Sequence, residues 1–146
     1  MIGLLQRVSR ASVRVDEREV AAIGVGLLVL VGVQRGDGAA QAERLLERLI
    51  SYRVWPDAAG KMNLSLRDTG HDLLLVPQFT LAADTSNGTR ASFTSAAEPA
   101  AARALFAHLL DYARAGHPQV ASGIFGADMQ VSLVNDGPVT FLLEAR

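Results

Sequence analysis

Short apolar runs rich in Val and Leu, separated by charged residues and glycine, occupy the first quarter of the chain. Residues 2–8, 12–15 and 26–33 follow this pattern, which is typical of β-strands. The polar sequence at residues 16–18 interrupts it and predicts a hairpin. We therefore expect the chain to begin with a group of strands.

Two stretches carry apolar residues at helical spacing. The first covers about residues 39–52, after a loop that ends at Asp37 or Gly38. The second begins near Glu98-Pro99, where Pro suits the first turn of a helix, and stops at Gly116. The apolar residues expected to be buried by the two helices are Leu45, Leu46, Leu49 and Ile50, and Leu105, Phe106, Leu109 and Leu110.

Later segments return to strand patterns. Residues 72–81 include four consecutive apolar positions, so both faces of this strand are expected to be buried. Residues 129–134 alternate, and residues 139–143 are apolar again after a break at 135–138. Strands dominate and two main helices are interleaved. The pattern predicts a single domain, residues 1–146, of mixed α/β (α+β) class with a mixed β-sheet.

Composition narrows the function. The 146 residues include 14 Lys+Arg and 15 Asp+Glu, a net charge of −1, and no Cys. Thiol nucleophiles and Cys-ligated metals are excluded, and a protein that wraps long nucleic acid is disfavoured, although contact with one nucleic-acid end is not. The longest uncharged run, Val20–Gln34, is too short to span a membrane. We expect a soluble cytoplasmic protein that does not bind membranes.

Common catalytic and cofactor motifs are missing from the sequence. There is no complete dinucleotide-binding loop, no P-loop and no GxSxG elbow. The three histidines, at positions 71, 108 and 117, stand apart without metal-ligand spacing. We predict neither a metal nor a cofactor.

The sequence Pro77-Gln78-Phe79-Thr80 stands out at the end of a buried strand. Pro cannot donate to a sheet ladder, so the strand should break here and free backbone N–H groups. The backbone amides of Gln78 and Phe79, the Gln78 side chain and the Thr80 hydroxyl would then be donors for a developing oxyanion. A strand that simply ends with an edge Pro is the alternative.

Two other segments have a functional and a structural interpretation. Asn-Asp-Gly-Pro at 135–138 reads first as a turn, but a cis Gly137-Pro138 bond would point two carbonyl oxygens in one direction. Phe125 and Met129, in a glycine-punctuated loop, either sandwich a flat ligand such as a base or pack in the core. None of these segments alone is specific.

Together these segments resemble the D-aminoacyl-tRNA deacylase family, in family order and spacing, over essentially the whole chain. The resemblance implies a homodimer with a β-barrel-like body and active sites at the subunit interface. It implies hydrolysis of the ester that joins a D-amino acid, or glycine, to the 3′ end of tRNA. The matching segments are Gln6-Arg7-Val8, Gly60-Lys61-Met62-Asn63-Leu64-Ser65, Gln78-Phe79-Thr80-Leu81, Arg90 with Ser92-Phe93, Gly126-Ala127-Asp128-Met129 and Asn135-x-Gly137-Pro138-Val139-Thr140.

The resemblance also implies roles for particular residues. Gly137-Pro138 would be cis and enter the other subunit's site, where it leaves room only for hydrogen on one side of Cα and so excludes L side chains. Arg7 would hold this segment. The opposite, catalytic wall would be Gln78, Phe79 and Thr80, and the terminal adenosine would bind Phe125 and Met129.

Two positions depart from the family pattern. Pro77 replaces a common Ser, which removes any hydroxyl role there, and Ala91 replaces a common Pro in the loop before Ser92-Phe93.

The motif contains no His, Lys or carboxylate that would activate Thr80, which argues against a covalent acyl-enzyme. We expect water to attack with help from the ribose 2′-OH. Near-neutral charge fits recognition limited to the CCA end. The alternatives are a non-catalytic dimeric module that binds a nucleotide or RNA end, a synthetase-linked editing domain, which a free-standing chain disfavours, and a scaffold without ligand.

Overall fold

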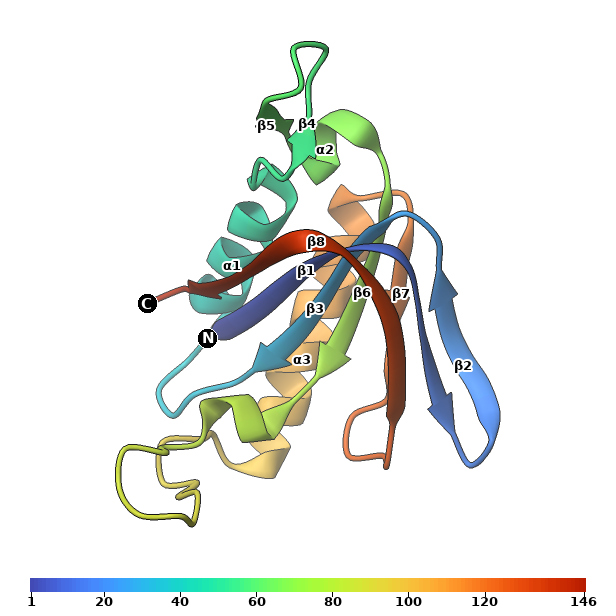
Figure 1. Cartoon of the computed structure of the whole chain (residues 1–146). Helices are drawn as coiled ribbons and strands as arrows, with labels where there is room; N and C mark the ends of the chain where they lie inside the picture. The colour runs from blue at the N-terminus through green and yellow to red at the C-terminus, as the bar shows by residue number, and fades with distance from the viewer.

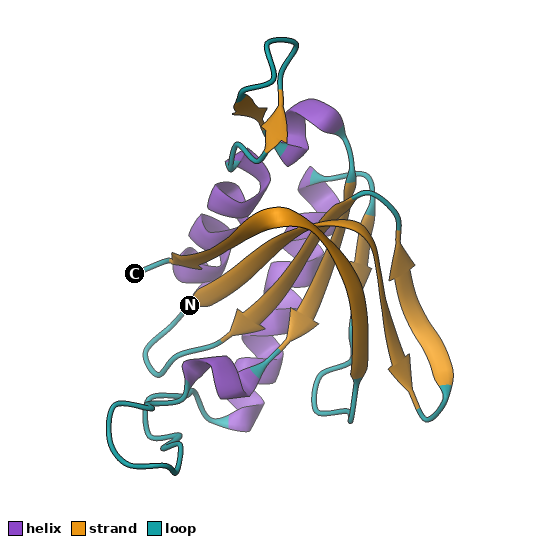
Figure 2. Cartoon of the chain, in the orientation of Figure 1, coloured by secondary structure: helices purple, strands orange, loops and turns teal.

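The computed structural model describes residues 1–146, the whole chain (Figure 1). More of its residues lie in strands than in helices, and the helices lie between the strands in sequence (Figure 2). The elements are β1 (Ile2–Val15), β2 (Arg18–Ile23), β3 (Gly26–Gly32), α1 (Ala39–Ser51), β4 (Trp55–Pro56), β5 (Met62–Leu64), α2 (Leu66–Thr69), β6 (Asp72–Pro77), the 3₁₀-helix η1 (Phe79–Ala82), α3 (Pro99–Gly116), β7 (Val120–Ser122) and β8 (Gln130–Glu144).

One mixed sheet organises the chain. Its strand order is β2-β1-β3-β6-β7, and β8 pairs antiparallel with β1. The pairs β3–β6 and β6–β7 are parallel, joined by crossovers that contain α1 and α3. Figure 1 shows α1 and α3 together on one face, while β8 curves across the other side. The mixed α/β class is confirmed, with a nearly closed, barrel-like sheet and few helices.

The core has two parts because β6 is buried on both faces. Leu73 and Leu75 point into a large cluster with both long helices, whereas Leu74 and Val76 point into a smaller one. Strands β3 and β6 approach closely at their start. A Cβ on Gly26 would lie 2.0 Å from the Asp72 carbonyl oxygen, so only glycine fits there.

Several sequence predictions are confirmed. The β1–β2 hairpin turns at Asp16 and Glu17, which have φ values of 49° and 64°. Helix α1 follows Gly38, and α3 begins at Pro99 and ends at Gly116. In α3 the fully buried apolar residues are Ala102, Phe106, Leu109 and Ala113, while Leu105 and Leu110 are only half-buried.

Two predicted breaks are wrong, because both segments lie inside long strands. Residues 2–8 and 12–15 form one strand, β1, in which Arg10 and Ala11, between these runs, pair with β8. Residues 135–138 are not a turn but an irregular part of β8, where the register with β1 shifts. The Asn135 side chain replaces ladder bonds there: its Nδ2 donates to the carbonyls of Arg7 (2.8 Å) and Val139 (3.0 Å).

The strand predicted over residues 72–81 is shorter than expected. It ends at Pro77, and the next residues wind into η1. The small elements β4 and α2 had no clear pattern, since each has no more than four residues. Strand β5 lies within the segment 60–65 that resembles the family. None of the helices is both long and apolar enough to cross a bilayer.

Candidate active site

The first part of the candidate site lies where β6 ends and η1 begins. The Gln78 N–H donates to the Val31 carbonyl at 2.8 Å, which adds one more bond to the sheet. This amide is therefore engaged and not free for an oxyanion, contrary to the expectation for it. The N–H groups of Phe79 and Thr80 are in the first turn of η1, where helix geometry gives them no intrahelical partner.

The side chains of Gln78, Phe79 and Thr80 lie together at the start of η1. Gln78 Nε2 donates to Thr80 Oγ1 at 2.6 Å, so the hydroxyl is held by an amide and not by a base. Phe79 is 59% exposed, which is unusual for a large apolar residue. Its ring meets that of Phe93, with centroids 5.3 Å apart, so the residue 84–97 loop adds an aromatic group to this surface.

Two neighbouring cavities open beside Phe79. Both are lined by Pro77, Phe79 and Gly126. The first, of about 250 Å³, is mainly apolar and adds Ala97, Pro99, Ala102 and Phe125. The second, of about 310 Å³, adds Gln78, Ala127, Asp128, Met129 and Val131.

Phe125 and Met129 thus line different cavities, one on each side of Gly126. The Met129 sulfur accepts a weak hydrogen bond from the Ile124 N–H at 3.4 Å. Phe125 is half-buried, with its ring 6.5 Å from that of Phe106 and the Arg103 guanidinium 4.8 Å from its centroid. The sequence analysis did not identify Arg103. This residue lies on α3, three residues before Phe106, and only the fold shows that it contacts Phe125.

The Gly137-Pro138 segment forms a second, separate part. Its peptide bond is cis, and both residues are exposed. Arg7 contacts the residue that precedes this segment: Nε donates to the Asp136 carbonyl at 2.9 Å and lies 3.2 Å from the Asp136 carboxylate. A further bond joins the Arg7 guanidinium to the Val54 carbonyl. A side chain on Gly137 would collide with Asn135, since its Cβ would lie 2.4 Å from Oδ1.

Within one chain these two parts lie at opposite ends of the sheet. Asn135 pairs with Val8, which pairs with Gly26, which pairs with Asp72 at the start of β6. Gln78 follows the other end of β6. Six residues of strand correspond to about 20 Å. Neither cavity beside Phe79 includes a residue of 135–138.

The ionisable groups near the site are few. Hydrogen bonds from Ser86 hold the pKa of Asp84, just after η1, below its usual value. His108 pairs with Glu43 at 2.9 Å, and the buried His117 bonds to the His71 carbonyl at 2.6 Å. His108 and His117 therefore have structural partners, and no histidine lines either cavity. No three His, Asp or Glu residues cluster as metal ligands would.

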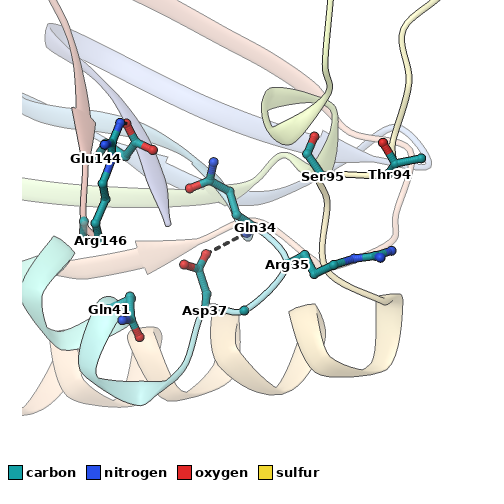
Figure 3. Close-up of a pocket in the computed structure, with 10 residues that line it drawn as sticks. Gln34, Arg35, Asp37, Gln41, Thr94, Ser95, Glu144 and Arg146 are labelled. Atoms are coloured by element: carbon teal, nitrogen blue, oxygen red, sulfur yellow. Dashed lines mark hydrogen bonds and ion pairs between the residues drawn. The ribbon is translucent and has the colours of Figure 1, made fainter.

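The largest cavity, of about 470 Å³, lies elsewhere and is lined mainly by polar and charged residues (Figure 3). Figure 3 shows Asp37 accepting a hydrogen bond from the Gln34 N–H, at 2.7 Å. Beside it the Met1 amino group lies 2.7 Å from Asp37. The cavity contains none of the candidate site residues that the sequence indicated.

A single family model matches nearly the whole chain. It is described as D-Tyr-tRNA(Tyr) deacylase and aligns with residues 4–144. The chain belongs to this family, which confirms the resemblance found from the sequence motifs.

Individual relatives agree. The chain is 68% identical to the D-aminoacyl-tRNA deacylase of Thioalkalivibrio sulfidiphilus over 99% of this chain and 97% of that protein. It is 62% identical to the deacylase of the same name from Methylococcus capsulatus, over 98% and 94%.

Two solved structures share the fold over nearly their full length. One is described as "c-Myc DNA Unwinding Element Binding Protein", with a TM-score of 0.96 and 35% identity over 100% of this chain and 99% of that one. The other is described as a probable eukaryotic D-amino acid tRNA deacylase, with a TM-score of 0.83 over 98% of both chains. At 17% identity, the second shows likeness of fold alone.

Proposed function

We propose that this protein is a D-aminoacyl-tRNA deacylase, which hydrolyses the ester between a D-amino acid and the 3′ end of tRNA. The observation that carries the proposal is the full-length identity of 68% with a relative of that name. The geometry at η1 agrees with it, because free N–H groups lie beside cavities of a size that suits a nucleoside and a small side chain.

The chemistry follows from what lies at this turn. Water attacks the ester carbonyl, the bond to the ribose 3′-oxygen breaks, and the proton from water ends on that oxygen. The N–H groups of Phe79 and Thr80 stabilise the developing oxyanion. Thr80 does not act as nucleophile, because its oxygen accepts from Gln78 and no base adjoins it. The neighbouring 2′-OH of the substrate assists the water.

Selectivity comes from the Gly137-Pro138 segment of a second copy. Exposed as it is, and braced by Arg7 and Asn135, it presents a fixed backbone surface to another molecule. Placed against the substrate Cα, this surface leaves space for hydrogen only, so an L side chain is rejected sterically. Glycine has no side chain to reject, and glycyl-tRNA is therefore also a substrate.

A homodimer with shared active sites is the assembly that this requires. The two parts of the site are about 20 Å apart along the strands of one chain, so a second chain must supply one of them. Strand β8 offers the surface, since it pairs on one edge only and exposes large apolar side chains. These are Leu133, Val134, Phe141 and Leu142.

Substrate recognition is confined to the CCA end. The chain has a net charge of −1, so it lacks the overall positive field that long phosphate contacts need. Affinity for uncharged tRNA should therefore be weak. We place the protein in the cytoplasm, where its substrate is made.

The deciding experiment is paired hydrolysis of D-Tyr-tRNA and L-Tyr-tRNA by the purified protein, each against a control without enzyme. Rapid loss of the D-ester alone supports the proposal and its stereochemical filter. Loss of both esters at similar rates contradicts the filter. No acceleration of either ester by folded protein contradicts the deacylase function.

A non-catalytic dimeric module that binds a nucleic-acid end is the second candidate. One observation favours it: the 35% identical structure is named as a DNA unwinding element binding protein. Binding of a CCA-ending oligonucleotide without turnover of D-Tyr-tRNA would select this alternative.

A further inference from the structure

Arg103 carries a cation to the rim of the apolar cavity beside Phe79. Its guanidinium carbon lies 4.8 Å from the centre of the Phe125 ring, and its Nη2 would lie 3.4 Å from a Cβ on Gly126. Phe125 and Gly126 both line the cavity. The positive charge of Arg103 therefore lies at the cavity and not on the far side of α3.

The guanidinium has no partner within the protein. Arg103 takes part in none of the six ion pairs. Nearby, Arg35 from the loop before α1 pairs at 4.0 Å with Glu98, the residue that precedes α3. No side-chain hydrogen bond involves it either, and the residue is exposed. Stacking on an aromatic ring holds a planar guanidinium in place while leaving its N–H groups available, which suits bidentate recognition of phosphate.

The surrounding backbone favours the same ligand. Pro99 and Ala102, in the first turn of α3, line the cavity. The positive end of the dipole of this 18-residue helix is thus directed to the same place. An apolar cavity with a cation and a helix N-terminus at its rim matches a nucleoside with its attached phosphate.

We propose that Arg103 binds a backbone phosphate of the tRNA 3′ end while the terminal adenosine occupies the apolar cavity. This rests on the proposed deacylase function and extends it. Arg103 is then a substrate-binding residue that acts on affinity and has no part in the bond-breaking step.

Two substrates separate this role from a structural one. The first is D-Tyr-tRNA, and the second is adenosine carrying D-tyrosine as an ester on its 3′-hydroxyl, which has no phosphate. For Arg103→Gln we expect KM for D-Tyr-tRNA to rise about tenfold with kcat nearly unchanged, since one charged hydrogen-bonded contact is lost. Hydrolysis of the adenosine ester should not change.

Further variants sharpen the result. Arg103→Lys should recover part of the loss, because charge is kept but the two-pronged geometry is not. Arg114→Gln, at the exposed end of the same helix, is the matched control and should behave as wild type. Raising the salt concentration should weaken tRNA binding by the wild type more than tRNA binding by Arg103→Gln. The slope of the logarithm of the binding constant against the logarithm of the salt concentration should be steeper for the wild type by about 0.7.

Other outcomes overturn the inference. Equal losses on both substrates would mean that Arg103 only supports Phe125, and no loss on either would mean that it touches no phosphate. Binding of a CCA-ending oligonucleotide by fluorescence anisotropy gives a readout without turnover. If wild type hydrolyses neither substrate, the proposed function fails, and weaker oligonucleotide binding by Arg103→Gln still decides the role of Arg103.

Discussion

Arg7 holds Asp136 at two points, through the backbone carbonyl at 2.9 Å and the side-chain carboxylate at 3.2 Å. The guanidinium is only 13% exposed, whereas the carboxylate is 57% exposed. The backbone contact should therefore matter more, because an exposed ion pair is screened by solvent. Strand β1 in this way fixes the segment of β8 that includes Gly137-Pro138.

Replacing Arg7 tests this hierarchy. Arg7→Met should lower D-Tyr-tRNA hydrolysis by at least tenfold, because it releases the Asp136 and Val54 carbonyls from the guanidinium. Asp136→Asn keeps the backbone carbonyl and should retain activity within about threefold. Initial rates on D- and L-Tyr-tRNA measure both effects. Equal losses in the two variants would show that the ion pair, and not the backbone bond, positions the segment.

Gly137→Ala adds a methyl group where none fits. Its Cβ would lie 2.4 Å from Asn135 Oδ1, so the Asn135 side chain must move. We expect a stability loss of about 1–3 kcal/mol together with loss of D-ester hydrolysis or admission of the L-ester. Thermal unfolding and the paired assay measure these.

Gly116→Ala is the matched control, because its Cβ would meet nothing within 4 Å. It should leave both stability and selectivity close to wild type. A Gly137→Ala protein with normal rates and unchanged rejection of L-Tyr-tRNA would remove this segment from the proposed filter.

The chemical step can be separated from the Thr80 hydroxyl. Thr80→Ala should keep activity within about tenfold, because the hydroxyl accepts from Gln78 and has no base beside it. Substrate ending in 2′-deoxyadenosine should react at least about a hundredfold more slowly, as the assisting group is gone. Single-turnover rates distinguish chemistry from binding. Complete loss in folded Thr80→Ala, with equal rates on the deoxy substrate, would reverse the assignment.

Asp68 gives a prediction for stability against pH. Hydrogen bonds from the Ser65 N–H and hydroxyl, both at 2.8 Å, hold the pKa of Asp68 below its usual value. A depressed folded-state pKa stabilises the fold above the unfolded value, and this contribution is lost as the pH falls through the folded value. Asp68→Asn should therefore lower the urea midpoint at neutral pH.

The difference in urea midpoint between wild type and Asp68→Asn should shrink as the pH is lowered below about 4. Asp111→Asn, an exposed α3 position without a side-chain hydrogen bond, should show no such pH-dependent difference. A gap that widens in acid would contradict the prediction.

Most of the secondary structure could be predicted because its cause is local. The apolar spacing of α1, Pro99 at the start of α3 and the buried sequence of β6 each determine an element from neighbouring residues. The continuity of β8 could not, since it depends on Asn135 reaching the Arg7 carbonyl, 128 residues away in sequence. A local reading of Asn-Asp-Gly-Pro therefore gives a turn.

In the candidate site, too, features set by neighbouring residues could be predicted, and features set by residues far apart in sequence could not. Pro77 indicated that the strand breaks before Gln78, but the commitment of the Gln78 N–H to Val31 depends on sheet pairing. Likewise, Phe125 and Met129 are four residues apart, yet Gly126 and the packing of Pro77 and Phe79 separate the cavities that they line. Arg103 could not be predicted from the sequence, because only the fold places its side chain against Phe125.

The placement of the two parts of the proposed site at opposite ends of the sheet has a genetic consequence. If each site takes one part from each chain of a two-fold dimer, a Gly137 variant that has lost D-ester hydrolysis and a variant inactivated at the Phe79–Thr80 turn are each inactive alone. Mixed together, they form heterodimers with one doubly damaged site and one fully native site. Two null alleles would then complement each other, and activity would return in a mixture of two dead proteins.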